Sequence, residues 1–108
     1  MKLKVRNLFE KPEGVGEDFY PLLTNPALKL EHIVSRGANS DEEFWYDQET
    51  DEWVVLLKGT AVLEKENGEL IPLKGGDHLV IPAHCRHRVA STSSDAHWLA
   101  LHCAEPLV

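Results

Sequence analysis

Short apolar runs, each bounded by glycine, proline or asparagine, recur along this chain of 108 residues. Apolar and polar side chains alternate over residues 28–34, a compact apolar run follows at 53–57, and over residues 60–66 Ala61 and Leu63 lie opposite Val62 and Glu64. Both patterns are typical of β-strands. The Asn67-Gly68 pair between two runs is the strongest hairpin signal in the sequence. Because no segment of ten or more residues has a capped helical period, the pattern predicts an all-β sandwich or barrel.

The two ends of the chain are harder to assign. Alternation of Leu3 and Val5 with basic residues predicts a first strand over residues 1–6. Residues 19–23 are apolar but interrupted by Pro21, which predicts a short edge strand or an irregular segment. A last strand is expected over residues 97–103. Its inner face is either the set Trp98, Ala100 and His102 or the set Leu99, Leu101 and Cys103, and alternation leaves both open.

Residues 76–89 predict a turn, a strand, a tight bend and a second strand. Gly75-Gly76 permits positive φ in the turn, and Pro82 ends the first strand because it lacks an N–H for the ladder. Two imidazoles, His84 and His87, lie at or just after the bend. A rigid corner that carries histidine into a sheet interior is a suitable place to hold a metal ion.

Composition narrows the class of protein. Hydrophobic residues make up 43% and charged residues 27%, and no apolar run reaches the ~20 residues of a membrane span. The start lacks the apolar block of a signal peptide, so we expect a cytoplasmic protein without membrane partners. A net charge of −7 argues against a nucleic-acid partner. Cys85 and Cys103 do not form a CxxC pair and are expected to be reduced, buried side chains.

Two spaced motifs resemble those of the cupin superfamily, and the resemblance covers nearly the whole chain. The second cupin motif is Gly, five residues, Pro, one residue, Gly, two residues, His. Gly76, Pro82 and His87 occupy these places, and His84 stands at the second Gly. The first motif is His-x-His, three or four residues, Glu, six residues, Gly, of which Glu52 and the final Gly are present.

The resemblance implies an all-β double-stranded β-helix, the cupin jelly-roll barrel. It implies a single cupin domain over residues 1–108. The core barrel would span about residues 27–104, and an N-terminal strand and loop would occupy residues 1–26. Cupin barrels commonly pair through N-terminal strands, so the resemblance also implies a homodimer.

In metal-binding cupins three His and one Glu hold Fe, Mn, Ni, Cu or Zn at the barrel mouth. This chain retains Glu52 and His87 but lacks the His-x-His pair. With a three-residue spacer the missing places hold Tyr46 and Gln48, and with four they hold Trp45 and Asp47. The expected metal ligands are Glu52, His87 and Gln48, with Tyr46, Asp47 and His102 lining the pocket.

His84 is expected to act as a further ligand or as a general base, because its ordinary pKa is near neutral. Three functions remain open. The first is a cupin that binds a divalent transition metal (Fe, Mn, Ni or Zn) and acts on a small polar metabolite. The second is a metal-free binding or sensor module for a small molecule. The third is a metal-free isomerase or epimerase in which His87 or His84 is the base.

Overall fold

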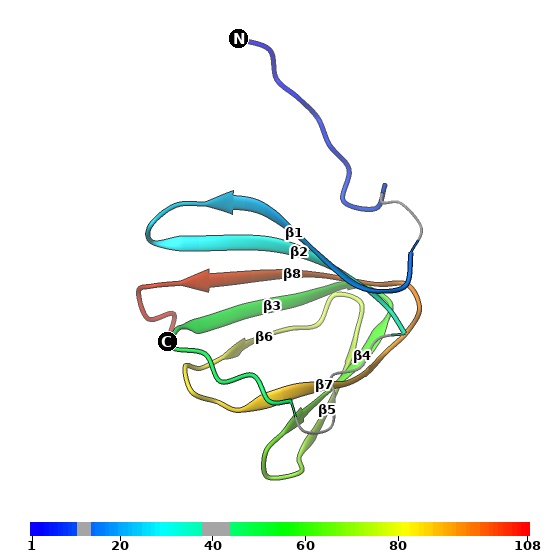
Figure 1. Cartoon of the computed structure of the whole chain (residues 1–108), viewed down its shortest axis with the longest axis vertical. Coiled ribbons are helices and arrows are strands. Elements are labelled where there is room, and N and C mark those ends of the chain that lie inside the picture. Colours follow the sequence, from blue (N-terminus) through cyan, green and yellow to red (C-terminus); the bar gives the residue numbers. More distant parts are fainter. Residues whose placement is uncertain (11–13, 38–43) are drawn as a thin grey trace.

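The computed structural model of the protein describes residues 1–10, 14–37 and 44–108. Regular structure in these ranges is entirely β: β1 (Gly16–Thr24), β2 (Leu28–Arg36), β3 (Asp51–Lys58), β4 (Thr60–Lys65), β5 (Leu70–Lys74), β6 (His78–Ile81), β7 (His87–Thr92) and β8 (Ala96–Cys103). A five-stranded antiparallel sheet of order β1-β2-β8-β3-β6 faces a three-stranded sheet of order β5-β4-β7 (Figure 1). This arrangement confirms the predicted all-β jelly-roll fold. No helix in the described ranges is long and apolar enough to span a bilayer.

The apolar core lies between the two sheets and is built by the inward faces of β3, β4 and β8. Leu56 is fully buried there, and Val54, Leu63 and Trp98 pack in the same cluster. Since side chains alternate along a strand, Glu52 shares the inner face of β3 with Val54 and Leu56. One face of β3 therefore passes from apolar core to a carboxylate near one end of the barrel.

The same alternation settles which face of β8 points inward. Cross-strand register pairs His102 with Glu52, Ala100 with Val54 and Trp98 with Leu56. Trp98 and Ala100 are buried, and His102 lines the same interior. Of the two alternatives left open by the sequence, the set Trp98, Ala100 and His102 is the inner one.

The predicted hairpin is present between β4 and β5. Gly68 takes a positive φ of 90°, which glycine adopts without strain, and the Asn67 side chain accepts a hydrogen bond from the Glu69 N–H at 2.9 Å. Gly59 joins β3 to β4 with φ of 88°, and a Cβ there would approach Ser93 Oγ to 2.5 Å. Local turn chemistry thus sets the order in which the strands enter the two sheets.

The strand predicted over residues 1–6 is wrong. Residues 1–7 have no strand partner and extend away from the sheets (Figure 1). Leu3 and Val5 are exposed. Alternation yields a strand only where a sheet edge accepts its hydrogen bonds, and the edge of β2 is taken by β1 instead. The edge-strand alternative for residues 19–23 is confirmed: β1 lies at the sheet edge, with a register shift between Pro21 and Leu23.

Candidate functional site

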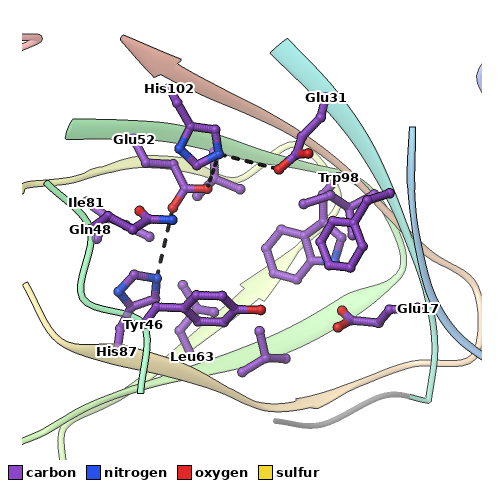
Figure 2. Close-up of a pocket in the computed structure, with 14 residues that line it drawn as sticks. Glu17, Glu31, Tyr46, Gln48, Glu52, Leu63, Ile81, His87, Trp98 and His102 are labelled. Carbon is purple, nitrogen blue, oxygen red and sulfur yellow. Dashed lines mark ion pairs between the residues drawn. The ribbon is translucent and has the colours of Figure 1, made fainter. Parts of the chain in front are cut away.

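A cavity opens between the two sheets, and we call it the cup. It contains about 570 Å³ of empty space, part of which is open to solvent. Strands from both sheets and the segment before β3 contribute its walls (Figure 2). The lining residues are Glu17, Phe19, Glu31, Ile33, Tyr46, Gln48, Glu52, Val54, Leu63, Ile81, His87, Val89, Trp98 and His102.

An imidazole lies between two carboxylates on the wall formed by β2, β8 and β3. His102 Nε2 is 3.4 Å from Glu31 Oε1 and 3.5 Å from Glu52 Oε2 (Figure 2). Antiparallel register places these side chains together, because Glu52 is directly opposite His102 on the neighbouring strand. Lys29 also contacts Glu31, with Nζ 3.3 Å from Oε2. The Glu31 carboxylate is therefore held from two sides.

Glu52 is the carboxylate with the most altered acidity in the cup. Glu52 is only 8% exposed to solvent. Burial raises the pKa of Glu52 to about 7, and the negative charge of Glu31 adds to the rise. Both the acid and the carboxylate are consequently populated near neutral pH. A group in that condition can accept and return a proton within one reaction cycle.

His87 begins β7 and is oriented by its neighbours. Its backbone forms a two-way bridge with Tyr46, and the two rings stack with centroids 5.5 Å apart. Nδ1 lies 2.8 Å from the Cys85 carbonyl oxygen. Because a carbonyl only accepts, Nδ1 carries the proton, and burial lowers the pKa of His87 so that the neutral ring is favoured. Nε2 is then an acceptor facing the cup, 4.0 Å from Glu52 Oε1.

Tyr46 and Gln48 complete this side of the cup (Figure 2). Burial raises the pKa of Tyr46, and the negative charges of Glu17, Glu52 and Glu31 raise it further. Its hydroxyl therefore remains protonated and able to donate. The Gln48 amide adds both donors and an acceptor. Three carboxylates that act on one phenol must surround the same space.

The structure brings five of the predicted site residues together in the cup: Tyr46, Gln48, Glu52, His87 and His102. His84 and Asp47 are not among the lining residues. They pair with each other on the surface, with His84 Nδ1 2.9 Å from Asp47 Oδ1. His84 has a φ of 62°, in the left-handed region that favours glycine. This geometry explains why cupins place glycine here, and it directs the His84 side chain to solvent.

Two carboxylates that line the cup were not predicted from the sequence: Glu17 and Glu31. Glu31 left a signal, because it shares its side of the alternating strand with the apolar residue Ile33. Its neighbour His32 faces the other side of the sheet, where its Nε2 is 3.0 Å from His97 Nδ1. Glu17 follows a glycine-rich loop and gave no signal.

The predicted metal site was tested against the positions of the donors. Glu52, His87 and Gln48 do lie near one another in the cup. Among the residues that the structure describes, however, no three His, Cys, Asp or Glu side chains are grouped so that they could hold a metal ion. The His102 ring instead fills the space between two carboxylates as an ion-pair partner. The described His, Cys, Asp and Glu side chains therefore do not by themselves form a metal site.

A sequence model of the cupin domain matches residues 31–102. This chain belongs to the cupin family. A crystal structure from Ralstonia eutropha JMP134, provisionally named a mannose-6-phosphate isomerase, is 44% identical to this cupin. The match has a TM-score of 0.88 and covers 95% of this chain and 100% of the other.

More distant solved structures share the fold alone. A cupin superfamily protein from Desulfitobacterium hafniense DCB-2 is 17% identical, with a TM-score of 0.75 over 88% of this cupin and 84% of that chain. KdgF from Halomonas sp. is 23% identical, with a TM-score of 0.72 over 85% and 82%. Among curated proteins, none matches this sequence.

Proposed function

We propose that this cupin catalyses a proton transfer in a small polar molecule held in the cup, with Glu52 as the acid–base group. One observation carries the proposal: a buried carboxyl with a pKa of about 7 faces a cavity that is open to solvent. Catalytic acids and bases need a pKa near the working pH, and perturbed carboxyls in clefts are candidates for such a role. An isomerisation or epimerisation is the simplest reaction of this kind.

The reaction needs no reactant beyond the substrate. The Glu52 carboxylate takes a proton from a carbon next to a carbonyl, and the electron pair moves to the carbonyl oxygen. Tyr46 and Gln48 provide O–H and N–H donors for that oxygen on the same side of the cup. The Glu52 carboxylic acid then returns the proton to the former carbonyl carbon. The proton of the adjacent hydroxyl passes through His87 to the former carbonyl oxygen, so that a new carbonyl forms next to the old one. Charge and atoms balance within one substrate molecule.

The imidazoles have supporting roles in this scheme. His102 contacts Glu52 and Glu31 and holds the Glu52 carboxylate in the cup. Neutral His87 presents Nε2 as an acceptor and can receive a hydroxyl proton from the substrate. No step is routed through a metal, since no three His, Cys, Asp or Glu side chains of the described residues are grouped to hold one. The provisional name of the Ralstonia relative supports the reaction class, because an aldose isomerase moves a proton between adjacent carbons.

Deuterium uptake tests the proposal. The protein is incubated in D₂O with a panel of small aldoses, ketoses and amino sugars, and NMR follows exchange at the carbon next to the carbonyl. We expect exchange with the wild-type protein after treatment with a chelator, and none with Glu52→Gln. Binding without exchange would instead indicate a sensor or binding module. Exchange that appears only after Fe, Mn, Ni or Zn is added would contradict the metal-free scheme.

A further inference from the structure

Negative charge predominates among the side chains that line the cup. Glu17, Glu31 and Glu52 contribute three carboxyl groups, and the described lining residues include no Lys or Arg. One cationic side chain adjoins the lining: Lys29, whose Nζ is 3.3 Å from Glu31 Oε2. Arg88 and Arg36 pair with carboxylates outside the cup, Arg88 with Glu64 at 2.7 Å and Arg36 with Asp18 at 2.9 Å. A ligand that enters the cup therefore meets three carboxyl groups, of which Glu31 already has a cationic partner.

The three carboxyl groups differ in the partners with which they already interact. Glu31 has Lys29 and His102 as partners, and Glu52 has His102 and is partly protonated near neutral pH. Within the described residues, the contact made by Glu17 is a hydrogen bond from Ser35, 2.7 Å from Oγ to Oε2, and no Lys, Arg or His pairs with it. Glu17 is thus the carboxylate whose charge is left for a ligand.

Glu17 is also held in place. Ser35 is fully buried, and its Oγ accepts a hydrogen bond from Trp98 Nε1 at 3.2 Å while it donates to Glu17. This chain of donors fixes one oxygen of the carboxylate, and the Glu17 side chain lines the cup (Figure 2). A charged group positioned in advance binds its partner without the cost of ordering a free side chain.

A second, independent feature favours a ligand that donates hydrogen bonds. His87 is 7% exposed, and its Nε2 is an acceptor aimed into the cup (Figure 2). The nearest ion-pair atom, Glu52 Oε1, is 4.0 Å away, too long for a hydrogen bond. An ammonium group supplies three donors and no acceptor. Phe19, Tyr46 and Trp98 add aromatic faces, which attract cations.

We propose that the cup binds a small organic cation, a polar molecule with a protonated amine, and that Glu17 receives the amine. The proposal rests on the proposed function in taking the cup as the substrate site. A phosphorylated sugar is disfavoured here, because its phosphate would face three carboxyl groups and no Lys or Arg of the described lining. The ligand class thus differs from the one in the provisional name of the Ralstonia relative.

Two series of ligands with matched shapes and different charges test this inference. The first is mannosamine, mannose and mannose 6-phosphate; the second is 4-aminocyclohexanol, cyclohexane-1,4-diol and 4-hydroxycyclohexanecarboxylate. Calorimetry at neutral pH gives affinity, and the indole N–H resonance of Trp98 reports binding in the cup. In each series we expect the amine to bind roughly tenfold or more tightly than the neutral member, as for a hydrogen bond to a charged group. The anion should bind weakest.

Glu17→Gln should remove this preference for the amine, since glutamine keeps an acceptor for Ser35 but loses the charge. Asp18→Asn is the matched control, because Asp18 is adjacent in β1 but pairs with Arg36. The inference is overturned if an anion binds as well as its matched amine, if no amine in either series binds, or if Glu17→Gln and Asp18→Asn behave alike. Amine binding without deuterium exchange would remove the proposed reaction and leave the ligand class standing.

Discussion

Asp51 and Glu52 are neighbours on β3, both carboxylates and almost equally buried, at 9% and 8% exposed. They face opposite sides of the sheet, and their pKa values are shifted in opposite directions. Asp51 accepts hydrogen bonds at 2.8 Å from the backbone N–H groups of Ala83 and Leu107, and these lower its pKa. Glu52 faces the cup, where burial and Glu31 raise its pKa to about 7.

The comparison shows that burial alone does not set the chemistry of a carboxyl group. Backbone donors on the outer side stabilise the charged form of Asp51, which makes it a structural anchor for the bend before β7 and for the C-terminal segment. The inner side offers Glu52 an imidazole and another carboxylate, and no backbone donor contributes to its pKa shift. A carboxylate is thus a structural anchor on one face of the sheet, and on the other it is the acid–base group that we propose.

Glu52→Gln should have the largest effect of any single substitution. Removal of a general acid–base group costs roughly 10²–10⁴-fold in rate, so we expect deuterium exchange to fall at least that far. In the wild type, exchange should increase with pH around a midpoint of about 7, because the base must be ionised. A pH–rate profile of exchange checks both points. Residual exchange within tenfold of the wild type would exclude Glu52 as the base.

The same variant should be more stable than the wild type at alkaline pH. The folded-state pKa of Glu52, about 7, lies above its ordinary value of 4.5. Its contribution to stability is therefore complete below pH 4.5 and is lost as pH rises through 7. The loss is on the order of 3 kcal/mol at most, and Glu52→Gln should not show it. Urea unfolding on either side of this interval measures the difference, and parallel curves for the two proteins would contradict the raised pKa.

Asp51→Asn should act on stability and leave the chemistry almost unchanged. The pKa of Asp51 is lowered in the folded protein, so its contribution is present above the ordinary value of 3.8 and is lost as pH falls through the folded-state pKa. The variant should unfold at lower urea than the wild type at neutral pH, and the two should converge in acid. Its exchange rate should stay within roughly threefold of the wild type, since Asp51 faces away from the cup.

Glu31→Gln should move the pH dependence rather than abolish activity. The negative charge of Glu31 helps to raise the pKa of Glu52, so its removal should shift the midpoint of the pH–rate profile below 7. We expect a smaller loss of rate than with Glu52→Gln. An unchanged midpoint would show that burial alone sets the acidity of Glu52.

His84→Ala should have the smallest effect. His84 and Asp47 form an exposed pair, and such pairs contribute about 0–1 kcal/mol to stability. Alanine keeps the strained positive φ at this position, so the variant isolates the loss of the side chain. Deuterium exchange should remain within roughly twofold of the wild type. A loss like that of Glu52→Gln would return His84 to the role of base that the sequence suggested.

Motif spacing was enough to place the centre of the site. Glu52 and His87 stand at fixed distances from Gly59 and Pro82 along the chain, and the strands that carry them meet in the cup. Motif spacing did not show that His84 lies outside the site. The sequence does not reveal that this position has a positive φ, so His84 resembled a candidate ligand. Spacing also gave no indication of Glu17, which lies on β1, the strand that pairs with the edge of β2.

The sequence by itself determined the strands, the turns between them and the two residues around which the site is organised. Those properties follow from local periodicity, from backbone conformations that only some residues adopt, and from separations along the chain. Only the tertiary structure decided that Glu31, His102 and Glu52 adjoin, that Asp51 is bound by backbone donors, and that Glu17 faces the cavity. The acidity of a carboxyl group depends on what surrounds it in space, and residues far apart in the chain supply those surroundings.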